Sequence, residues 1–261
     1  MARLSVPAIV AIFVAVLALR LGLAPILSIE DPTQRVIEAI PAMCAVFAAL
    51  SFERGDPPLR PWVLLAIALL AVPLARLSLH FDLRLGDAKV GHIFLIASNF
   101  LCIAAIAGFR RVLVSTGLTA EWSPTAPSGR SLLVLMIAIA AAVLGLIVVQ
   151  VVDLLPLSAL TTGTAIAASV SLVSTICDGI LCAGGLLLVW LVRPMLGGSV
   201  ALPYFLVAFG GAVFLIVDIF HVLLHTTTQD QFASPLPIGV ATIGWVALAL
   251  AGLSQRLLVR T

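Results

Sequence analysis

Charged residues are scarce in this chain. Of its 261 residues, only 10% are Asp, Glu, Lys or Arg, whereas about a quarter of an average soluble domain is charged. Twelve acidic and 14 basic residues are too few to cover the water-facing surface of a chain of this length, and 62% of the residues are apolar. The composition therefore indicates a membrane protein, for which lipid is the main solvent.

The scarcity of lysine and the absence of several sequence motifs exclude some partners and some kinds of active site. Lys89 is the only lysine and the net charge is +2, so the chain lacks the basic patch that nucleic-acid binding requires. No Walker-type loop, GxGxxG, CxxC or GxSxG motif is present, which excludes the usual nucleotide, thioredoxin-like and serine-hydrolase sites. Lys89 also lies outside the seventh apolar run, which excludes a retinal Schiff base there. All four cysteines lie inside apolar runs, which argues against a disulfide scaffold.

Long apolar runs dominate the sequence instead. A helix needs about 20 mostly apolar residues to cross a hydrocarbon core about 30 Å thick. The runs are uniformly apolar and do not alternate, so we expect helices and not barrel strands. The predicted fold is an all-α, polytopic bundle of eight transmembrane helices, at residues 6–27, 36–52, 61–79, 90–108, 131–154, 164–193, 200–225 and 235–257.

One polar segment divides these runs into two sets of four. Residues 110–130 are predicted to be a cytoplasmic connection between helices 1–4 (residues 1–109) and helices 5–8 (residues 131–261) of one membrane domain. Arg20 interrupts the place where a signal peptide would be cleaved, so we interpret the first run as a retained helix. No internal repeat relates the two halves, which gives little support to an inverted-repeat transporter.

The basic residues predict the orientation. With eight crossings, nine arginines fall on the side of the two termini and five basic residues on the other side. This bias predicts cytoplasmic termini, in a multi-pass protein of the inner membrane of a bacterium. Three aromatic residues lie near cytoplasmic helix ends, where they fit either an interfacial belt or a packing role: Trp62, Trp190 and Tyr204. All four histidines fall at the opposite helix ends: His80, His92, His221 and His225.

The sixth run carries the deepest ionisable residue, Asp178. A central Asp costs about 2.5–3.5 kcal/mol on insertion scales, so such residues usually face a partner or a cavity. Asp178 shares one helical stripe with Ser171, Ser174 and Cys182. A neighbouring stripe of small residues would let another helix approach closely; it comprises Ala167, Ser171, Thr175, Gly179 and Ala183. We therefore expect the sixth helix at the centre of the bundle.

The seventh run ends in a second polar face. Asp218, His221 and His225 are spaced by three and four residues and project from one side of a helix. Together with His92 they form a candidate site for a divalent metal such as zinc, or a proton relay toward Asp178. A haem between His92 and His221 is a weaker alternative.

Asp218 and Asp178 also have a purely structural interpretation, without a metal. Asp218 would then simply neutralise Arg20 or Arg76, which lie at comparable depth, and Asp178 would pair with a serine or a charged group.

The His221–His225 pair resembles part of the zinc site of the alkaline ceramidase and progestin/adipoQ receptor membrane hydrolases. The resemblance implies zinc bound by these two residues. Those families also place a serine four residues before a histidine on an earlier helix, whereas here Arg76 precedes His80 at that spacing.

Three functions remain open from the sequence. The first is metal-assisted or acid–base chemistry on a lipid-like or apolar substrate, with Asp178 and Asp218 as catalytic residues and His221, His225, Asp218 and His92 as metal ligands. The second is a non-catalytic sensor, or a subunit that packs against other membrane proteins. The third is transport of protons or a small solute.

Overall fold

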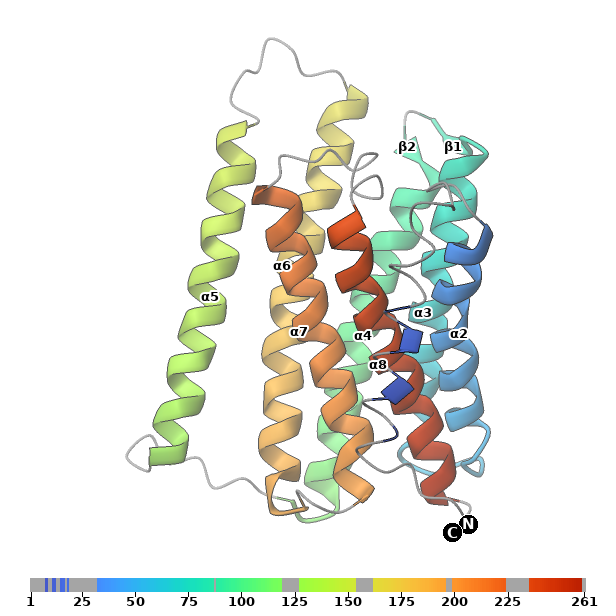
Figure 1. Ribbon diagram of the computed structural model, residues 1–261, viewed down its shortest axis with the longest axis vertical. Coiled ribbons are helices and arrows are strands. Elements are labelled where there is room, and N and C mark those ends of the chain that lie inside the picture. The colour runs from blue at the N-terminus through green and yellow to red at the C-terminus, as the bar shows by residue number, and fades with distance from the viewer. Residues whose placement is uncertain are drawn as a thin grey trace.

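Seven long helices make up nearly all of the described chain. The computed structural model describes residues 8, 11, 12, 15, 16, 18, 32–86, 88–118, 127–153, 162–195, 199–223 and 235–259. The helices are α2 (Pro32–Ala49), α3 (Leu59–His80), α4 (Val90–Ser115), α5 (Pro127–Asp153), α6 (Thr162–Val192), α7 (Leu202–Leu223) and α8 (Pro235–Val259). They run up and down along one direction (Figure 1).

The predicted helical membrane bundle is confirmed in its coarse form. Six of these helices, α3 to α8, are long and apolar enough to cross a membrane. Helix α2 contributes a shorter apolar stretch, Glu38–Ala49. The predicted span 6–27 lies mostly outside the described residues. The number of eight spans and the side of the termini therefore remain predictions.

Helix α4 is longer than predicted. It continues to Ser115, and α5 already begins at Pro127, so both ends of the predicted connection 110–130 are helical. Phe109 and Leu113 keep one buried apolar face on the last turns of α4, while Arg110 and Arg111 are exposed. Because that face continues to pack, the helix extends past the end of its apolar run.

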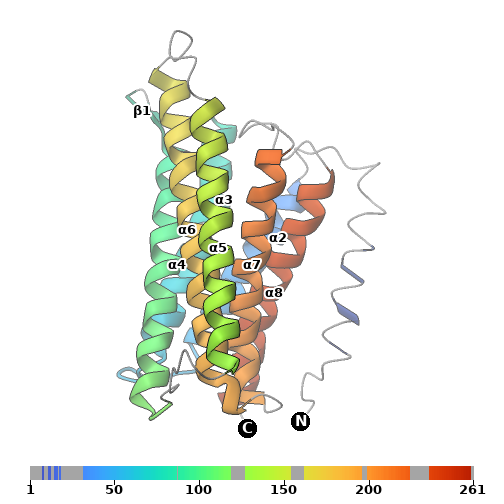
Figure 2. The same ribbon diagram turned by 90° about the vertical axis from the view of Figure 1, so that its left-hand side faces the viewer.

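Six helices form a closed ring. Each of α2, α3, α4, α6, α7 and α8 packs against the next in that order, and α8 packs back against α2. Helix α5 stands outside the ring against α6, with a smaller contact to α7. Figures 1 and 2 show α5 on the outer side of α6 in both views. The chain order and the spatial order thus differ at only one helix.

Small residues close the ring between α2 and α8. Ala45, Ala48 and Ala251 are fully buried, and the Cα of Gly252 lies so close to α2 that an added Cβ would stand 2.5 Å from the carbonyl oxygen of Cys44. Small side chains let membrane helices approach to backbone contact, which increases their van der Waals packing. This seam brings the second predicted span beside the last one.

Helix α6 is part of the ring and carries α5 on its outer side, which corrects the prediction that it occupies the centre. Two residues of its small-residue stripe face α5. Gly179 leaves no space for a Cβ beside Val143, and Thr175 accepts a 2.9 Å hydrogen bond from Gln150 Nε2. The stripe therefore fits its predicted role in close packing, with α5 as the partner. A pocket lined by all six ring helices lies inside the ring.

An aromatic cluster fills the ring at the end where α3 and α7 begin. Trp62 and Phe109 have ring centroids 5.0 Å apart, and Phe109 and Tyr204 have centroids 5.7 Å apart, both edge to face. Trp62 and Phe109 are fully enclosed and Tyr204 is buried. The sequence leaves both an anchoring and a packing role open for Trp62 and Tyr204, and the structure shows packing, because both rings contact Phe109 of α4.

The opposite end carries a short hairpin. Strands β1 (Arg84–Leu85) and β2 (Ala88–Lys89) pair antiparallel between α3 and α4. Asp82 forms ion pairs with Arg84 (2.9 Å) and Lys89 (3.5 Å). The hydrogen bond from Arg84 holds the pKa of the exposed Asp82 carboxyl below its usual range.

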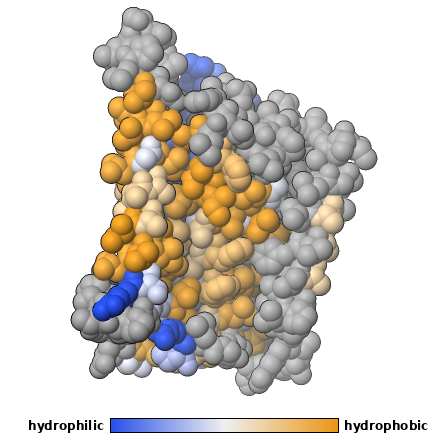
Figure 3. Space-filling model, turned by 60° about the vertical axis from the view of Figure 1, so that its left-hand side comes forward, coloured by the Kyte–Doolittle hydropathy of each residue, from blue (hydrophilic) through white to orange (hydrophobic). Residues whose placement is uncertain are grey.

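The outer surface of the bundle is apolar. Large exposed side chains on α5 include Val134, Ile137, Leu144 and Val148. Figure 3 shows a broad hydrophobic face, with hydrophilic residues near its upper and lower edges. An exposed apolar surface of this extent would aggregate in water and is the surface that a bilayer covers.

Candidate functional site

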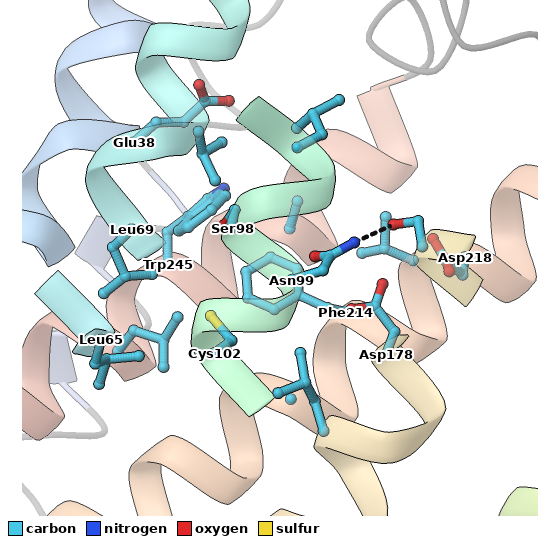
Figure 4. Close-up of a pocket in the computed structure, with 18 of the residues that line it drawn as sticks. Glu38, Leu65, Leu69, Ser98, Asn99, Cys102, Asp178, Phe214, Asp218 and Trp245 are labelled. Atoms are coloured by element: carbon cyan, nitrogen blue, oxygen red, sulfur yellow. Dashed lines mark hydrogen bonds between the residues drawn. The ribbon is translucent and has the colours of Figure 1, made fainter. Parts of the chain in front are cut away.

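The ring encloses a pocket of about 220 Å³. All six ring helices contribute to its lining, whereas none of the described side chains of α5 does. Most of the lining is apolar, and Figure 4 shows how side chains from α2, α3, α4, α6, α7 and α8 converge on it. The polar lining residues are Glu38, Arg76, His92, Ser98, Asn99, Ser171, Ser174, Asp178 and Asp218.

The pocket has a polar end and an apolar end. Glu38 lies early in α2, Arg76 late in α3, His92 in the first turn of α4 and Asp218 late in α7, so all four belong to the half of the bundle that carries the β-hairpin. Apolar lining residues from the middle and the other half of the helices close the opposite end, among them Leu65, Leu69, Ile106, Val207 and Leu248.

An ion pair lies at the polar end. Arg76 Nε and Glu38 Oε2 are 3.7 Å apart, and the Glu38 side chain is only 2% exposed. Glu38 Oε2 is enclosed and has no hydrogen-bond partner. The sequence analysis considered Arg76 as a counter-charge for Asp218. In the structure the ion-pair partner of Arg76 is Glu38.

Two carboxyl groups meet on the other side of the pocket. The side chains of Asp178 (α6) and Asp218 (α7) lie within hydrogen-bonding reach of each other. A hydrogen bond between two carboxyl groups requires a proton on one of them, because carboxylate oxygens only accept. Two carboxylates this close in an apolar site cannot both be ionised without a large repulsive energy. At least one of the two carboxyl groups is therefore protonated.

A hydrogen-bond chain connects this pair to α5. Gln150 Nε2 donates to Thr175 Oγ1 at 2.9 Å, so the Thr175 hydroxyl hydrogen is available for its hydrogen bond to Asp218. Thr175 is 1% exposed. Asp218 keeps its second oxygen, Oδ2, enclosed and without a hydrogen-bond partner.

Helix α4 supplies the neutral polar groups. Asn99 Nδ2 donates to Ser174 Oγ at 3.1 Å (Figure 4), and Ser98 Oγ donates to the Ala68 carbonyl at 2.8 Å. These bonds tie α4 to α6 and to α3. They hold this side of the pocket lining in place.

The four histidines have different surroundings. His92 lines the pocket, and its Nδ1 is enclosed without a hydrogen-bond partner. His80 is exposed at the end of α3 and packs against the ring of Phe81 at 5.2 Å. His221 belongs to the last turn of α7, at the same end of the bundle, but its side chain and the whole of His225 lie outside the described residues.

The described part of the chain contains no group of three or more His, Cys, Asp or Glu residues that could hold a metal ion. Of the four predicted ligands, it places the side chains of Asp218 and His92 at the pocket. The four cysteines are free thiols.

Sequence reasoning missed Glu38, Asn99 and Gln150, and it assigned Thr175 only to the small-residue stripe of the sixth helix. Asn99 and Gln150 each interrupt a long apolar run, and an uncharged amide in such a run is a signal that could have been used. Glu38 had no such signal, because it lies close to the predicted outer end of its helix.

No protein-family model, no curated protein and no solved structure matches this chain. The resemblance to zinc-dependent membrane hydrolases is therefore carried by His221 and His225 alone.

Proposed function

We propose that this multi-pass membrane protein binds a lipid-like amphiphile in the ring pocket, where Asp178 and Asp218 exchange protons with the polar group of the ligand. One observation carries the proposal. Glu38, Arg76, Asp178 and Asp218 come from four different helices of a bundle poor in charge, and all of them line the same pocket. Burying one such residue is unfavourable, and ionisable residues inside a membrane generally serve a function.

The roles of the two carboxyl groups follow from their hydrogen bonds. Asp218 receives the Thr175 hydroxyl and acts as the base, while Asp178 carries the proton and acts as the acid. Adjacent carboxyl groups in different environments divide the two roles in this way. The Glu38–Arg76 pair and the neutral groups of α4 orient the polar head of the ligand.

The metal-assisted version of this function depends on residues beyond the described part. Zinc held by Asp218, His92, His221 and His225 would supply a Lewis acid at the polar end of the pocket. Imidazole and carboxylate donors suit zinc, and the two described members of the set are both at the pocket.

The distribution of arginines supports an orientation of the bundle in the membrane. Seven described arginines lie at the end of the bundle where α3, α5 and α7 begin: Arg54, Arg60, Arg110, Arg111, Arg130, Arg193 and Arg256. Basic residues accumulate in cytoplasmic segments. We therefore assign this end to the cytoplasm, in a bacterial inner membrane, with the polar end of the pocket toward the other side.

The test compares lipids before and after contact with the protein. The purified full-length protein is reconstituted with a total polar lipid extract, and the bound and bulk lipids are identified by mass spectrometry, with metal content measured on the same sample. We expect one class of lipid to be retained or converted. Asp178→Asn should abolish conversion and keep retention, whereas Arg110→Gln, an exposed change, should alter neither. A lipid profile identical to that of empty vesicles would overturn the proposal.

Proton transport is the second candidate, favoured by the protonation of at least one of Asp178 and Asp218. It predicts proton uptake by proteoliposomes that Asp178→Asn abolishes, with no converted lipid. Sensor and subunit roles would show neither uptake nor conversion.

A further inference from the structure

The hairpin between α3 and α4 has a charged face and an apolar face. Arg84 and Lys89 lie directly opposite each other in the two strands, and each forms an ion pair with Asp82, at 2.9 and 3.5 Å. Successive side chains of a strand point to opposite faces, so Leu83 and Leu85, which flank Arg84, lie on the other face. The charged groups therefore gather on one face and leave the other apolar.

The apolar side chains of the hairpin are exposed. Leu83 and Leu85 are 49% and 69% exposed, and Phe81, which directly precedes the hairpin, is 65% exposed. Single exposed apolar side chains are common on protein surfaces, whereas a cluster of large ones marks a contact with a membrane or with another protein. These three residues lie within five positions of each other, so they form such a cluster.

Phe81 connects this cluster to the lipid-facing surface of α3. Its amide donates to the Leu77 carbonyl at 3.0 Å, so Phe81 continues the helical hydrogen-bond pattern. The exposed apolar residues of α3 recur at intervals of three and four and therefore form one stripe: Val63, Ile67, Leu70, Leu74 and Leu77. Phe81 is the next member, four residues after Leu77. The surface that a bilayer covers thus continues as far as the hairpin.

The length of α3 places the hairpin at the membrane surface. Arg60, in the first turn of α3, is exposed and marks one boundary of the hydrocarbon core, because a charge inside the core is costly. Phe81 follows Arg60 by 21 residues, a rise of about 32 Å, whereas the core is about 30 Å thick. The hairpin, at the other end of α3 in Figure 1, therefore lies where acyl chains and headgroups meet.

We propose that Phe81, Leu83 and Leu85 form an interfacial anchor that inserts into the lipid leaflet at this end of the bundle. Amphipathic segments bind a membrane surface with the apolar face buried about 5–10 Å into the boundary between headgroups and acyl chains. The opposite face of the hairpin, with Arg84 and Lys89, stays in water. The anchor lies outside the pocket and does not require that the pocket binds an amphiphile.

The anchor also sets the depth of the pocket. Leu79 and His92 both line the pocket, and they lie two residues before Phe81 and three residues after Lys89. The hairpin connects α3 and α4 directly. Insertion of its apolar side chains therefore holds the polar end of the pocket at the level of the lipid headgroups.

Spin labels at neighbouring positions test the insertion. Leu83→Cys, Leu85→Cys and, as the matched control on the opposite face, Arg84→Cys are each labelled with a nitroxide in the full-length protein and reconstituted into phosphatidylcholine vesicles. The unsubstituted protein, treated in the same way, gives the signal of the four native thiols. Electron paramagnetic resonance then measures collisions with molecular oxygen, which concentrates in lipid, and with a nickel chelate, which stays in water.

We expect the ratio of oxygen to nickel collisions to be about tenfold higher for Leu83→Cys and Leu85→Cys than for Arg84→Cys, because only the first two labels enter the interface. All three positions are exposed, so folding should not depend on them. Either apolar position decides the matter if the other variant fails.

Two results would overturn the anchor. Equal ratios at the three positions, with every label accessible to the nickel chelate, would place the hairpin in water. Few collisions with either reagent at Leu83→Cys and Leu85→Cys would show that protein covers the apolar face, from a second copy or another part of the chain. Neither result bears on the ligand of the pocket, so the anchor and the proposed function can fail separately.

Discussion

Helices α3 and α5 show how differently two membrane helices of one chain can be used. In α3, 56% of the spanning window is buried inside the protein, whereas in α5 the share is 11%. Helix α5 is the more apolar of the two, yet it lines no part of the pocket. The strongest hydropathy signal thus marks the helix that faces lipid, and the weaker signals mark the helices that surround the site. A search for function in such a chain should begin with its least apolar spans.

The buried ion pair gives the largest expected difference between the two regions. Arg76→Met leaves Glu38 enclosed without its counter-charge, and breaking a buried pair in this way costs about 3–5 kcal/mol. Arg130→Met, at an exposed position near the start of α5, should change the free energy of unfolding by less than about 0.5 kcal/mol. Both are measured by denaturation in mixed micelles. Losses of equal size would mean that the ring interior is no more sensitive than α5.

Glycine substitutions compare the packing inside the ring, at the α2–α8 seam, with the packing of α5. Gly252→Ala places a Cβ against the backbone of α2, and overpacking of this kind costs about 1–3 kcal/mol. Gly145→Ala in α5 meets no atom within 4 Å and should be neutral, or stabilising by up to about 1 kcal/mol through helix propensity. Unfolding temperatures of the two variants check this. A neutral Gly252→Ala would show that the α2–α8 seam is loose.

The smallest loss of stability is expected at the contact between α5 and the ring helix α6. Gln150→Leu removes the donor to Thr175 but keeps the apolar contact with α6, and interhelical hydrogen bonds in membranes contribute about 0.6 kcal/mol on average. A double-mutant cycle with Thr175→Val measures the coupling. A value above about 2 kcal/mol would show that α5 is attached mainly by this bond.

Much of the fold follows from the lengths of the apolar runs, because a span is a local property. The Ser171, Ser174 and Asp178 stripe on α6 also follows from helical spacing, and all three residues line the pocket. The approach of Asp218 to Asp178 was only a hypothesis, because spacing within one helix says nothing about which residue of another helix faces it.

The order of the helices in space has no comparable local signal. Glu38 enters the site because α2 packs against both α3 and α8, and the nearly uniform apolar surfaces of these helices do not specify their neighbours. The inward position of Trp62 is likewise set by which helix packs against α3. Its place near a helix end allows either anchoring at the membrane surface or packing, and the contact with Phe109 on α4 decides for packing.

The α2–α8 seam has a consequence for biosynthesis. Helix α2 leaves the ribosome early and α8 last among the described helices, so the wall of the pocket that carries Trp245 is missing during most of translation. Glu38 therefore lies in an incomplete bundle until residues 235–259 have entered the bilayer. A nascent chain stalled before that point has all of its other helices and no enclosed chamber.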